Sequence, residues 1–134
     1  MSNRNVDVIR AAYEALARGD LQTMLSFVDE ELEWTYLDPC DQGAGPQVCY
    51  GRHELERTLQ HWDELGFTPQ LEEIQWRADR VMVAVRVPGI DAHYGAYPGD
   101  RAYTVLTVRN GQIVALRDCH NRGEALAVAL QRAR

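Results

Sequence analysis

The sequence predicts one α+β domain over residues 1–134, in which a curved, mostly antiparallel sheet wraps around helices and encloses a pocket. Two observations lead to this fold class. Helical periodicity fills most of the first half of the chain, and strand patterns fill most of the second half. Segregated helices and strands are typical of α+β folds, and a chain of this length normally forms one domain. A curved sheet around a long helix would leave a cone whose mouth can hold a ligand.

Two helices should open the chain. The first should bury apolar side chains that recur at intervals of three and four, namely Val6, Ile9, Tyr13 and Leu16. Gly19 fits the C-terminal cap of this helix, and Asp20 can cap the next one. The buried face of the second helix should carry Leu21, Met24, Leu25 and Val28.

The middle of the chain should hold a strand and a third helix. The segment ELEWTYL has the alternation and the aromatic residues of a strand, and Asp38-Pro39 ends it. A loop with Gly and Pro follows. The third helix should place Leu55, Leu59 and Trp62 along one face and end near Gly66.

The second half begins with LEEIQWRADRVMVAVRV, which is typical of two strands joined near Ala78-Asp79. Because alternate side chains of a strand share a face, one face of the second of these strands should carry Val81, Val83, Val85 and Val87. The other face should carry Met82, Ala84 and Arg86. The Gly- and Pro-rich residues 88–100 form a loop too long for a tight hairpin.

The last two strands, RAYTVLTV and QIVALRDCH, are joined at Asn110-Gly111, a strong hairpin signal because both residues accept positive φ. Strand alternation then places four side chains on one face, namely Val114, Leu116, Asp118 and His120. Cys119 points the other way. A core-facing stripe that ends in an acid and an imidazole indicates the floor or rim of a ligand cavity. Asn121 and Glu124 have capping-box spacing for a terminal helix.

The composition excludes several partners. A net charge of −6 without a basic stripe disfavours nucleic acid and anionic membranes. No apolar run has the length of a membrane-spanning helix, and the first residues lack the core of a signal peptide. We therefore expect a cytoplasmic protein.

Three cysteines, Cys40, Cys49 and Cys119, make an odd number without C-x-x-C spacing. In a cytoplasm they should be thiols, and a Cys40–Cys49 disulfide is the less favoured alternative. We expect no metal site, because paired ligand spacing is missing. We expect no cofactor either, since the sequence contains no G-x-S-x-G, P-loop or Rossmann glycine pattern.

Three segments resemble the NTF2-like superfamily, particularly its SnoaL-like and limonene-epoxide-hydrolase-like branches: YEALARGDLQTMLSFVDEELEW, CYGRHELERTL and VRNGQIVALRDCHNRGEAL. The resemblance covers nearly the whole chain and implies a cone-shaped α+β fold that usually pairs through the outer face of its sheet. The superfamily includes isomerases, cyclases, dehydratases, hydrolases and proteins without activity, so the fold alone does not assign a function.

The resemblance carries over to individual positions unevenly. The polyketide-cyclase-like branch uses an acid on the last strand, which matches Asp118, and the epoxide-hydrolase branch has an Arg-Asp step that resembles Arg117-Asp118. Arg86 resembles the pocket arginine of that branch, but Pro88 stands where its partner acid would be. The ketosteroid isomerase branch is matched poorly. Its tyrosine, base and second-acid positions fall at Ala12, Tyr36 and near Thr104.

These considerations predict a catalytic set of Asp118, Arg86 and His120, with Asp118 as base and His120 as proton shuttle or substrate donor. The substrate-binding walls should come from Trp34, Tyr36, Trp62, Leu106 and Leu116. A carboxyl group in an apolar pocket resists ionisation, which brings its pKa toward the range of a useful base. The alternative is a structural ion pair between Asp118 and Arg86 inside a hollow.

We expect a cofactor-independent enzyme that acts on a small, largely apolar molecule by general acid/base chemistry, as an isomerase, cyclase or hydrolase. A non-catalytic binder of a small hydrophobic ligand and an interaction module with a filled cone remain as alternatives. We also expect a homodimer through an outer sheet face that is too apolar to leave in water. That face should carry some of Val81, Val83, Val85, Ala115 and Cys119.

Overall fold

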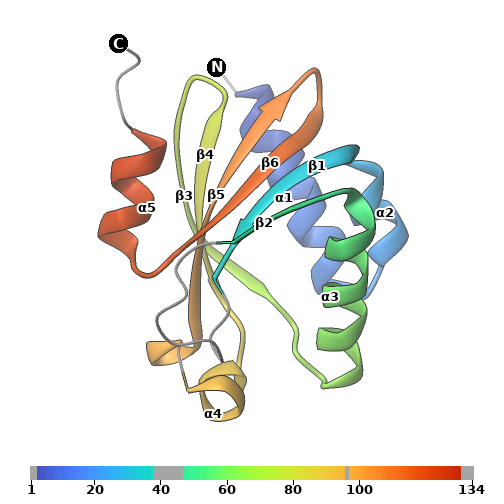
Figure 1. Ribbon diagram of the computed structural model, residues 1–134, viewed down its shortest axis with the longest axis vertical. Coiled ribbons are helices and arrows are strands. Elements are labelled where there is room, and N and C mark those ends of the chain that lie inside the picture. Colours follow the sequence, from blue (N-terminus) through green and yellow to red (C-terminus); the bar gives the residue numbers. More distant parts are fainter. Residues whose placement is uncertain (1–2, 38–46, 96, 131–134) are drawn as a thin grey trace.

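The computed structural model describes residues 3–37, 47–95 and 97–130 and confirms the α+β class (Figure 1). The helices are α1 (Arg4–Ala17), α2 (Leu21–Ser26), α3 (Arg52–Glu64), α4 (Ile90–Tyr94), the 3-10 helix η1 (Pro98–Asp100) and α5 (Arg122–Ala129). The strands are β1 (Val28–Tyr36), β2 (Gln47–Tyr50), β3 (Gln70–Arg77), β4 (Arg80–Arg86), β5 (Arg101–Arg109) and β6 (Gln112–Cys119).

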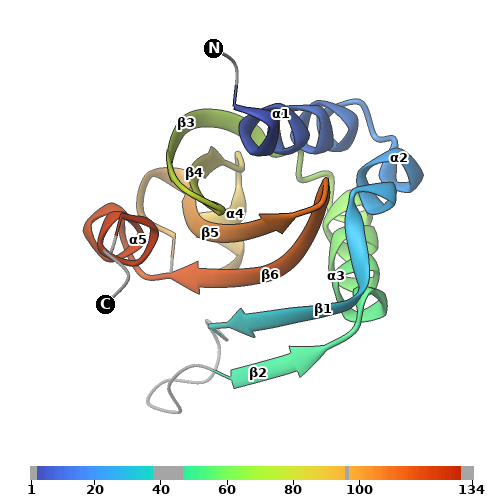
Figure 2. The same ribbon diagram turned by 90° about the horizontal axis from the view of Figure 1, so that it is seen from above.

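The six strands in the described residues form one curved sheet in the order β2-β1-β6-β5-β4-β3. In this order the β1–β6 pair is parallel, and the other neighbours are antiparallel. Seen from above, the sheet curls so that α1, α2 and α3 lie along its concave side, while α5 lies apart from them (Figure 2). The order follows the chain closely except where β6 inserts beside β1, which brings the last strand next to the first.

The predicted N-terminal caps of two helices are present, and the predicted end of the second helix differs from the observed one. The side chains of Asp20 and Asn121 accept hydrogen bonds from the backbone N–H groups of Thr23 and Glu124, at 3.2 and 2.8 Å. The second helix is shorter than predicted, because α2 ends at Ser26 and Val28 instead begins β1 as a buried strand residue. A side chain on a buried helix face and one on a buried strand face are equally apolar, so Val28 alone could not decide the boundary.

The main core lies between the helices and the concave face of the sheet. Its fully buried large residues include Ile9 of α1, Leu32 of β1, Ile90 of α4, Leu106 of β5 and Ile113 of β6. The valines Val81, Val83, Val85 and Val87 also belong to this core. The sequence analysis placed three of them on the outer face, and that assignment is wrong because α1 packs over the valine side of β4.

The outer face of β4, β5 and β6 is covered by α5. A second, smaller cluster forms there from Met82, Val105, Cys119, Ala125 and Ala129. Cys119 faces away from the main core, as predicted, but α5 leaves it only 7% exposed.

Two arginines hold α5 to the sheet. The Arg122 guanidinium donates to both carboxylate oxygens of Glu73 on β3, at 2.8 and 2.7 Å. Arg80 Nη1 donates to the backbone carbonyl of Val128 at 3.0 Å. The Arg122 contacts lower the pKa of Glu73 to about 2. The pair is partly exposed, so it should contribute only modestly to the docking of α5.

Replacing Arg122 by alanine should therefore expose Cys119 more often. In a protein with Cys40 and Cys49 changed to serine, we expect thiol labelling of Cys119 to accelerate by a small factor, about two- to fivefold, as suits the loss of a surface ion pair. Arg57→Ala is the matched control, because Arg57 pairs with Glu54 on the surface of α3. Equal labelling rates for both variants and the parent would contradict this account of α5.

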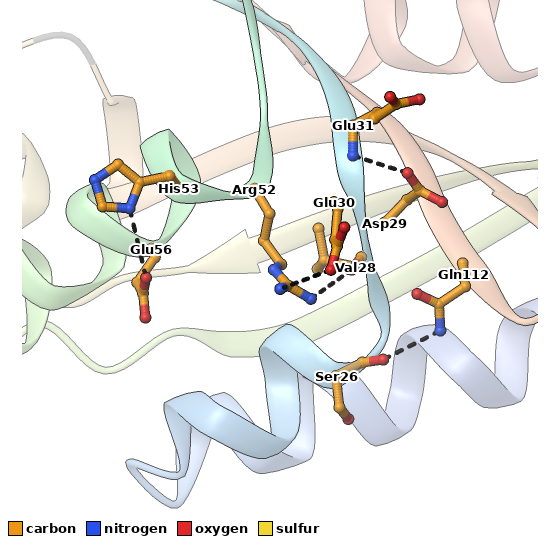
Figure 3. A network of polar contacts seen from close by, with 9 residues as sticks. All are labelled: Ser26, Val28, Asp29, Glu30, Glu31, Arg52, His53, Glu56 and Gln112. Carbon is orange, nitrogen blue, oxygen red and sulfur yellow. Dashed lines mark hydrogen bonds and ion pairs between the residues drawn. The ribbon is translucent and has the colours of Figure 1, made fainter.

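The start of β1 is fixed by a separate polar network (Figure 3). Arg52 at the start of α3 donates to the backbone carbonyl of Val28 at 3.4 Å and lies 3.9 Å from Glu30. Gln112 of β6 donates to the carbonyl of Ser26 at 3.1 Å, and the N–H of Ile113 donates to the carbonyl of Phe27 at 2.7 Å. These contacts set where β1 begins against β6, and a register shift between Val28 and Glu33 then sets which β1 residues reach the far end of β6.

Candidate functional site

The candidate site follows from the strand register on the concave face. Cross-strand partners share a face, so the pairs Ile74–Val83, Val83–Thr104 and Thr104–Asp118 form one row across four strands. This row is apolar on β3 and β4 and polar on β5 and β6. In the next row, Leu116 of β6 lies beside Trp34 of β1. Asp118 therefore has an apolar surface on one side and β1 on the other.

Asp118 accepts three hydrogen bonds from uncharged donors. The Trp34 indole Nε1–H donates to Oδ2 at 3.3 Å, and the Thr104 hydroxyl donates to Oδ1 at 3.5 Å. The backbone N–H of Leu37 donates as well. The two measured distances are long for hydrogen bonds to a carboxylate, which leaves the oxygens able to accept a further proton or donor.

Burial raises the pKa of Asp118 from 3.8 to about 6, against the opposing effect of the hydrogen bonds from Trp34, Leu37 and Thr104. Desolvation is the larger effect because the carboxylate loses water without gaining a cation. Asp118 is thus ionised at neutral pH but holds a proton more readily than an ordinary aspartate.

Tyr13 of α1 lies close enough to Asp118 for the two to interact electrostatically. Its ring packs against the core, as the sequence predicts, yet the residue keeps partial exposure. Burial and, to a smaller extent, the charge of Asp118 raise the pKa of the Tyr13 hydroxyl, so it stays protonated. Among the described residues, no hydrogen bond to this hydroxyl is found, which leaves it available to a ligand. Sequence reasoning missed this residue, and the one signal was a hydroxyl on an otherwise aliphatic helix face.

Cys49 of β2 pairs with Trp34 and belongs to the same surroundings. Burial, then Glu54 and Asp118, raise the pKa of its thiol, which disfavours the reactive thiolate. Cys49 and Cys119 are free thiols, as predicted. Cys40 lies outside the described residues.

The concave face is fully buried at its centre and partly exposed at the Asp118 end. Leu32, Leu106 and Ile113 are at most 1% exposed. In contrast, the side chains around the carboxylate keep intermediate exposure: Tyr13, Trp34, Tyr36, Cys49, Thr104 and Asp118. Asp118 therefore lies at the partly exposed end of the concave face.

Two of the three predicted catalytic residues lie elsewhere. Arg86 is exposed on the opposite side of the sheet from the valines of β4, and it influences Asp100 rather than Asp118. His120 follows the last residue of β6, is exposed, and its Nδ1 lies 2.9 Å from Glu124 Oε2. The structure therefore does not bring Arg86 and His120 together with Asp118. Strand alternation no longer holds beyond Cys119, so His120 turns toward α5.

Four of the five predicted substrate-binding residues lie beside or beneath Asp118, and Trp62 lies elsewhere. Trp34 contacts Asp118, and Tyr36 packs against Trp34 with ring centroids 5.5 Å apart while its hydroxyl donates to Gln47 at 3.0 Å. Leu106 and Leu116 are buried beneath the site, at 1% and 7% exposure. Trp62 of α3 instead borders a different hollow of about 440 Å³, between the end of α1, α2 and α3.

Metal chemistry has no structural support in the part of the chain described. There, no group of His, Cys, Asp and Glu side chains is arranged to hold a metal ion. In the same residues, no helix combines the length and apolarity needed to cross a membrane.

Comparison with solved structures agrees with this fold. An NTF2-like protein of unknown function from Burkholderia pseudomallei shares 19% identity at a TM-score of 0.64, covering 96% of this chain and 98% of its own. A Xanthomonas campestris protein described as a "putative polyketide cyclase" shares 26% identity at a TM-score of 0.59, covering 92% and 95%. A Sinorhizobium meliloti protein with the same description shares 15% identity at a TM-score of 0.61, covering 84% of this chain and 94% of its own.

No curated protein matches the chain significantly. The family model of the SnoaL-like domain, however, matches residues 9–116 of the sequence. This span begins in α1 and ends in β6, two residues before Asp118. Together with the curved sheet around α1 to α3, this match shows that the chain belongs to the SnoaL-like domain family of the NTF2-like fold.

Proposed function

We propose that this protein catalyses a proton-transfer reaction of the isomerase or cyclase type on a small, largely apolar molecule, with Asp118 as general base. The observation that carries this proposal is the placement of the Asp118 carboxylate at the partly exposed end of the apolar concave face, held by uncharged donors. A base in such surroundings is stronger than the same base in water, because its ionised form is less well solvated.

The residues around Asp118 would have different roles in such a reaction. The Trp34 indole and the Thr104 hydroxyl orient the carboxylate from β1 and β5. A carboxylate oxygen takes a proton from the substrate and returns it to another atom of the same molecule, so that no proton is gained or lost overall. The protonated Tyr13 hydroxyl, on the opposite element α1, can donate a hydrogen bond to the substrate oxygen on which charge develops.

Epoxide hydrolysis of the Asp-Arg-Asp kind is not favoured. Arg86 lies on the outer side of the sheet, and Pro88 is exposed and offers no carboxylate. The cyclase or isomerase chemistry needs neither residue. The neighbours described as polyketide cyclases support this choice only through their shared fold.

The test uses proton exchange, because exchange is detected on the substrate itself and the product need not be identified. The protein is incubated in D₂O with a panel of enolisable cyclic ketones, and loss of the α-proton signal is followed by ¹H NMR. We expect exchange above background that disappears in Asp118→Asn and persists in Asp79→Asn, a surface acid paired with Arg109. Exchange that is equal in both variants would contradict the proposal.

Ligand binding without turnover is the second candidate. One observation favours it: among the described residues, no cationic side chain faces Asp118 to stabilise an oxyanion. This candidate is distinguished by recovering a bound ligand chemically unchanged after long incubation, while the binding remains saturable. The partial exposure around Asp118 makes a filled cone the least favoured reading.

We also propose that the chain forms a homodimer through the part of the outer face that α5 leaves uncovered. Val48 and Tyr50 of β2 are 48% and 71% exposed, and Tyr50 borders a hollow of about 730 Å³ with Thr107, Val114 and Ala115. Such exposed apolar side chains are costly in a monomer. Val81, Val83 and Val85, which the sequence analysis assigned to this interface, lie in the core instead.

We expect light scattering with size-exclusion chromatography to give a dimer mass for the parent protein and a monomer mass for Tyr50→Glu. Burying a carboxylate without a partner at the interface opposes association. Trp76→Glu is the matched control, because Trp76 is 48% exposed but lies on the other edge strand, β3. A monomeric parent, or a dimer that survives Tyr50→Glu, would overturn the proposed interface.

A further inference from the structure

We infer that the molecule bound at Asp118 carries a positive charge, in the form of an ammonium group on an aromatic or apolar frame. The inference rests on the site assigned under the proposed function but not on the reaction proposed there. It concerns what Asp118 recognises, and it therefore applies to a substrate and to a ligand that is bound without turnover.

The first argument is the missing counter-ion. All three groups that donate to Asp118 are neutral: an indole N–H, a hydroxyl and a backbone N–H. The arginines on the flanking strands are directed elsewhere. Arg86 is exposed on the outer side, Arg101 pairs with Glu72 at 2.8 Å, and Arg117 is exposed opposite Val105 of the outer cluster.

The second argument is the sign of the remaining charge near the site. Glu54 of α3 acts on Cys49, which is itself influenced by Asp118, so a second acid lies in the same region, partly neutralised by Arg57 at 3.4 Å. An anionic ligand would be repelled by the Asp118 carboxylate, whereas a cation would be attracted.

The third argument is the aromatic surface beside the carboxylate. Trp34 donates to Asp118, Tyr36 packs against Trp34 at a tilt of 53°, and Tyr13 approaches from α1. Trp34 turns the N–H edge of its indole toward the carboxylate, so these rings supply apolar contact for the frame of a ligand rather than the contact for its charge. A carboxylate beside aromatic rings and lacking a cation of its own is suited to bind an organic ammonium group.

The consequence is selectivity by charge. An ammonium group relieves the unfavourable burial of the carboxylate, while a neutral hydroxyl in the same position adds only an ordinary hydrogen bond. We expect the cation to bind at least about tenfold more tightly than its neutral counterpart, which corresponds to about 1.4 kcal/mol.

The experiment compares three probes with the same ring and nearly the same length: 2-phenylethylammonium, 2-phenylethanol and 3-phenylpropanoate. Binding to the full chain is measured at neutral pH by isothermal titration calorimetry. We expect the affinity order ammonium, alcohol, carboxylate, with the carboxylate undetectable. In Asp118→Asn the preference for ammonium over alcohol should vanish, and in the surface control Asp79→Asn it should be retained.

Three results would overturn the inference: no binding of the ammonium probe at its solubility limit, equal or tighter binding of the alcohol, or an ammonium preference that survives Asp118→Asn. The proton-exchange test is separate. If the protein selects the ammonium probe but catalyses no proton exchange, the inference stands and the proposed reaction is contradicted. If it catalyses exchange but shows no charge selectivity, the proposed reaction stands and the inference is contradicted.

Discussion

Replacing Asp118 by asparagine is expected to lower the rate of proton transfer by about 10²- to 10⁴-fold, the usual contribution of a positioned general base. The asparagine oxygen can still accept the hydrogen bond from Trp34, and its NH2 group can donate to the Thr104 hydroxyl instead of accepting from it, so much of the local geometry is retained while the basic group is lost. Because burial raises the pKa of Asp118 to about 6, kcat/KM of the parent should rise with pH through that value and level off above it.

Thr104→Val gives a graded comparison for this result. It removes one donor from Asp118 and leaves the base in place, so we expect a smaller loss of rate and an acid limb of the pH profile displaced upward. A pH profile of kcat/KM for the parent, Thr104→Val and Asp118→Asn on the same exchanging ketone checks both expectations. An acid limb that persists in Asp118→Asn would assign the titrating group elsewhere.

The same substitution, Asp118→Asn, should stabilise the folded protein at neutral pH by about 2 to 3 kcal/mol, from a pKa of 3.8 in the unfolded chain and about 6 in the folded one. The folded state binds the proton of Asp118 more tightly than the unfolded state does. Ionisation above pH 6 therefore costs stability, and this cost is absent below about pH 4, where the carboxyl is protonated in both states.

Urea unfolding of the parent and Asp118→Asn between acidic and neutral pH measures this difference directly. The gap in free energy of unfolding should be small at low pH, grow as the pH rises through 4 to 6, and then stay constant. Asp79→Asn serves as control and should not gain stability, since Asp79 pairs with Arg109 on the surface. A variant that is destabilised at neutral pH would identify Asp118 as a structural acid.

Loss of rate together with gain of stability is the signature of a functional group held in unfavourable surroundings. A carboxylate kept for structural reasons would give the opposite sign, because its removal would break hydrogen bonds that the fold depends on. The two expected effects of Asp118→Asn are therefore more informative together than either one alone.

The sequence predicts much of the fold because its local signals agree with its long-range pattern. The turn at Asn110-Gly111 joins β5 to β6, and both turn residues have positive φ as that signal requires. From Leu116 to Cys119, alternation places Asp118 on the concave face and Cys119 on the other, as predicted. Val114 was wrongly placed on the concave face, because a register shift between Thr107 and Val108 puts Ile113 in the core instead. Asp118 and its neighbour Trp34 are the predicted residues that the structure brings together at the site.

The faces of β4 could not be assigned from the sequence. Residues Val81 to Val85 are all buried, because helix α1 covers one side of the strand and α5 covers the other. With both sides apolar, alternation shows which residues share a face but not which face is concave. This ambiguity led to the expectation of some of these valines at a dimer interface, while Arg86 was placed beside Asp118 by the family resemblance.

The surroundings of His120 and of the Tyr13 hydroxyl could not be predicted from the sequence, for different physical reasons. Alternation extends only as far as the strand, and β6 ends at Cys119, one residue before His120. Tyr13 has the spacing of a core residue and indeed packs in the core, but a tyrosine can bury its ring and still present its hydroxyl to a polar site. Neither outcome could be read from spacing along one element.

The most direct test of the central claim is the titration of the Asp118 carboxyl itself. In protein labelled with ¹³C at the aspartate carboxyl carbons, the Asp118 signal is identified by its loss in Asp118→Asn and followed as the pH is changed. We expect its midpoint near pH 6, as burial on the concave face requires. A midpoint near the ordinary value of 3.8 would contradict the claim that Asp118 is held there as a base.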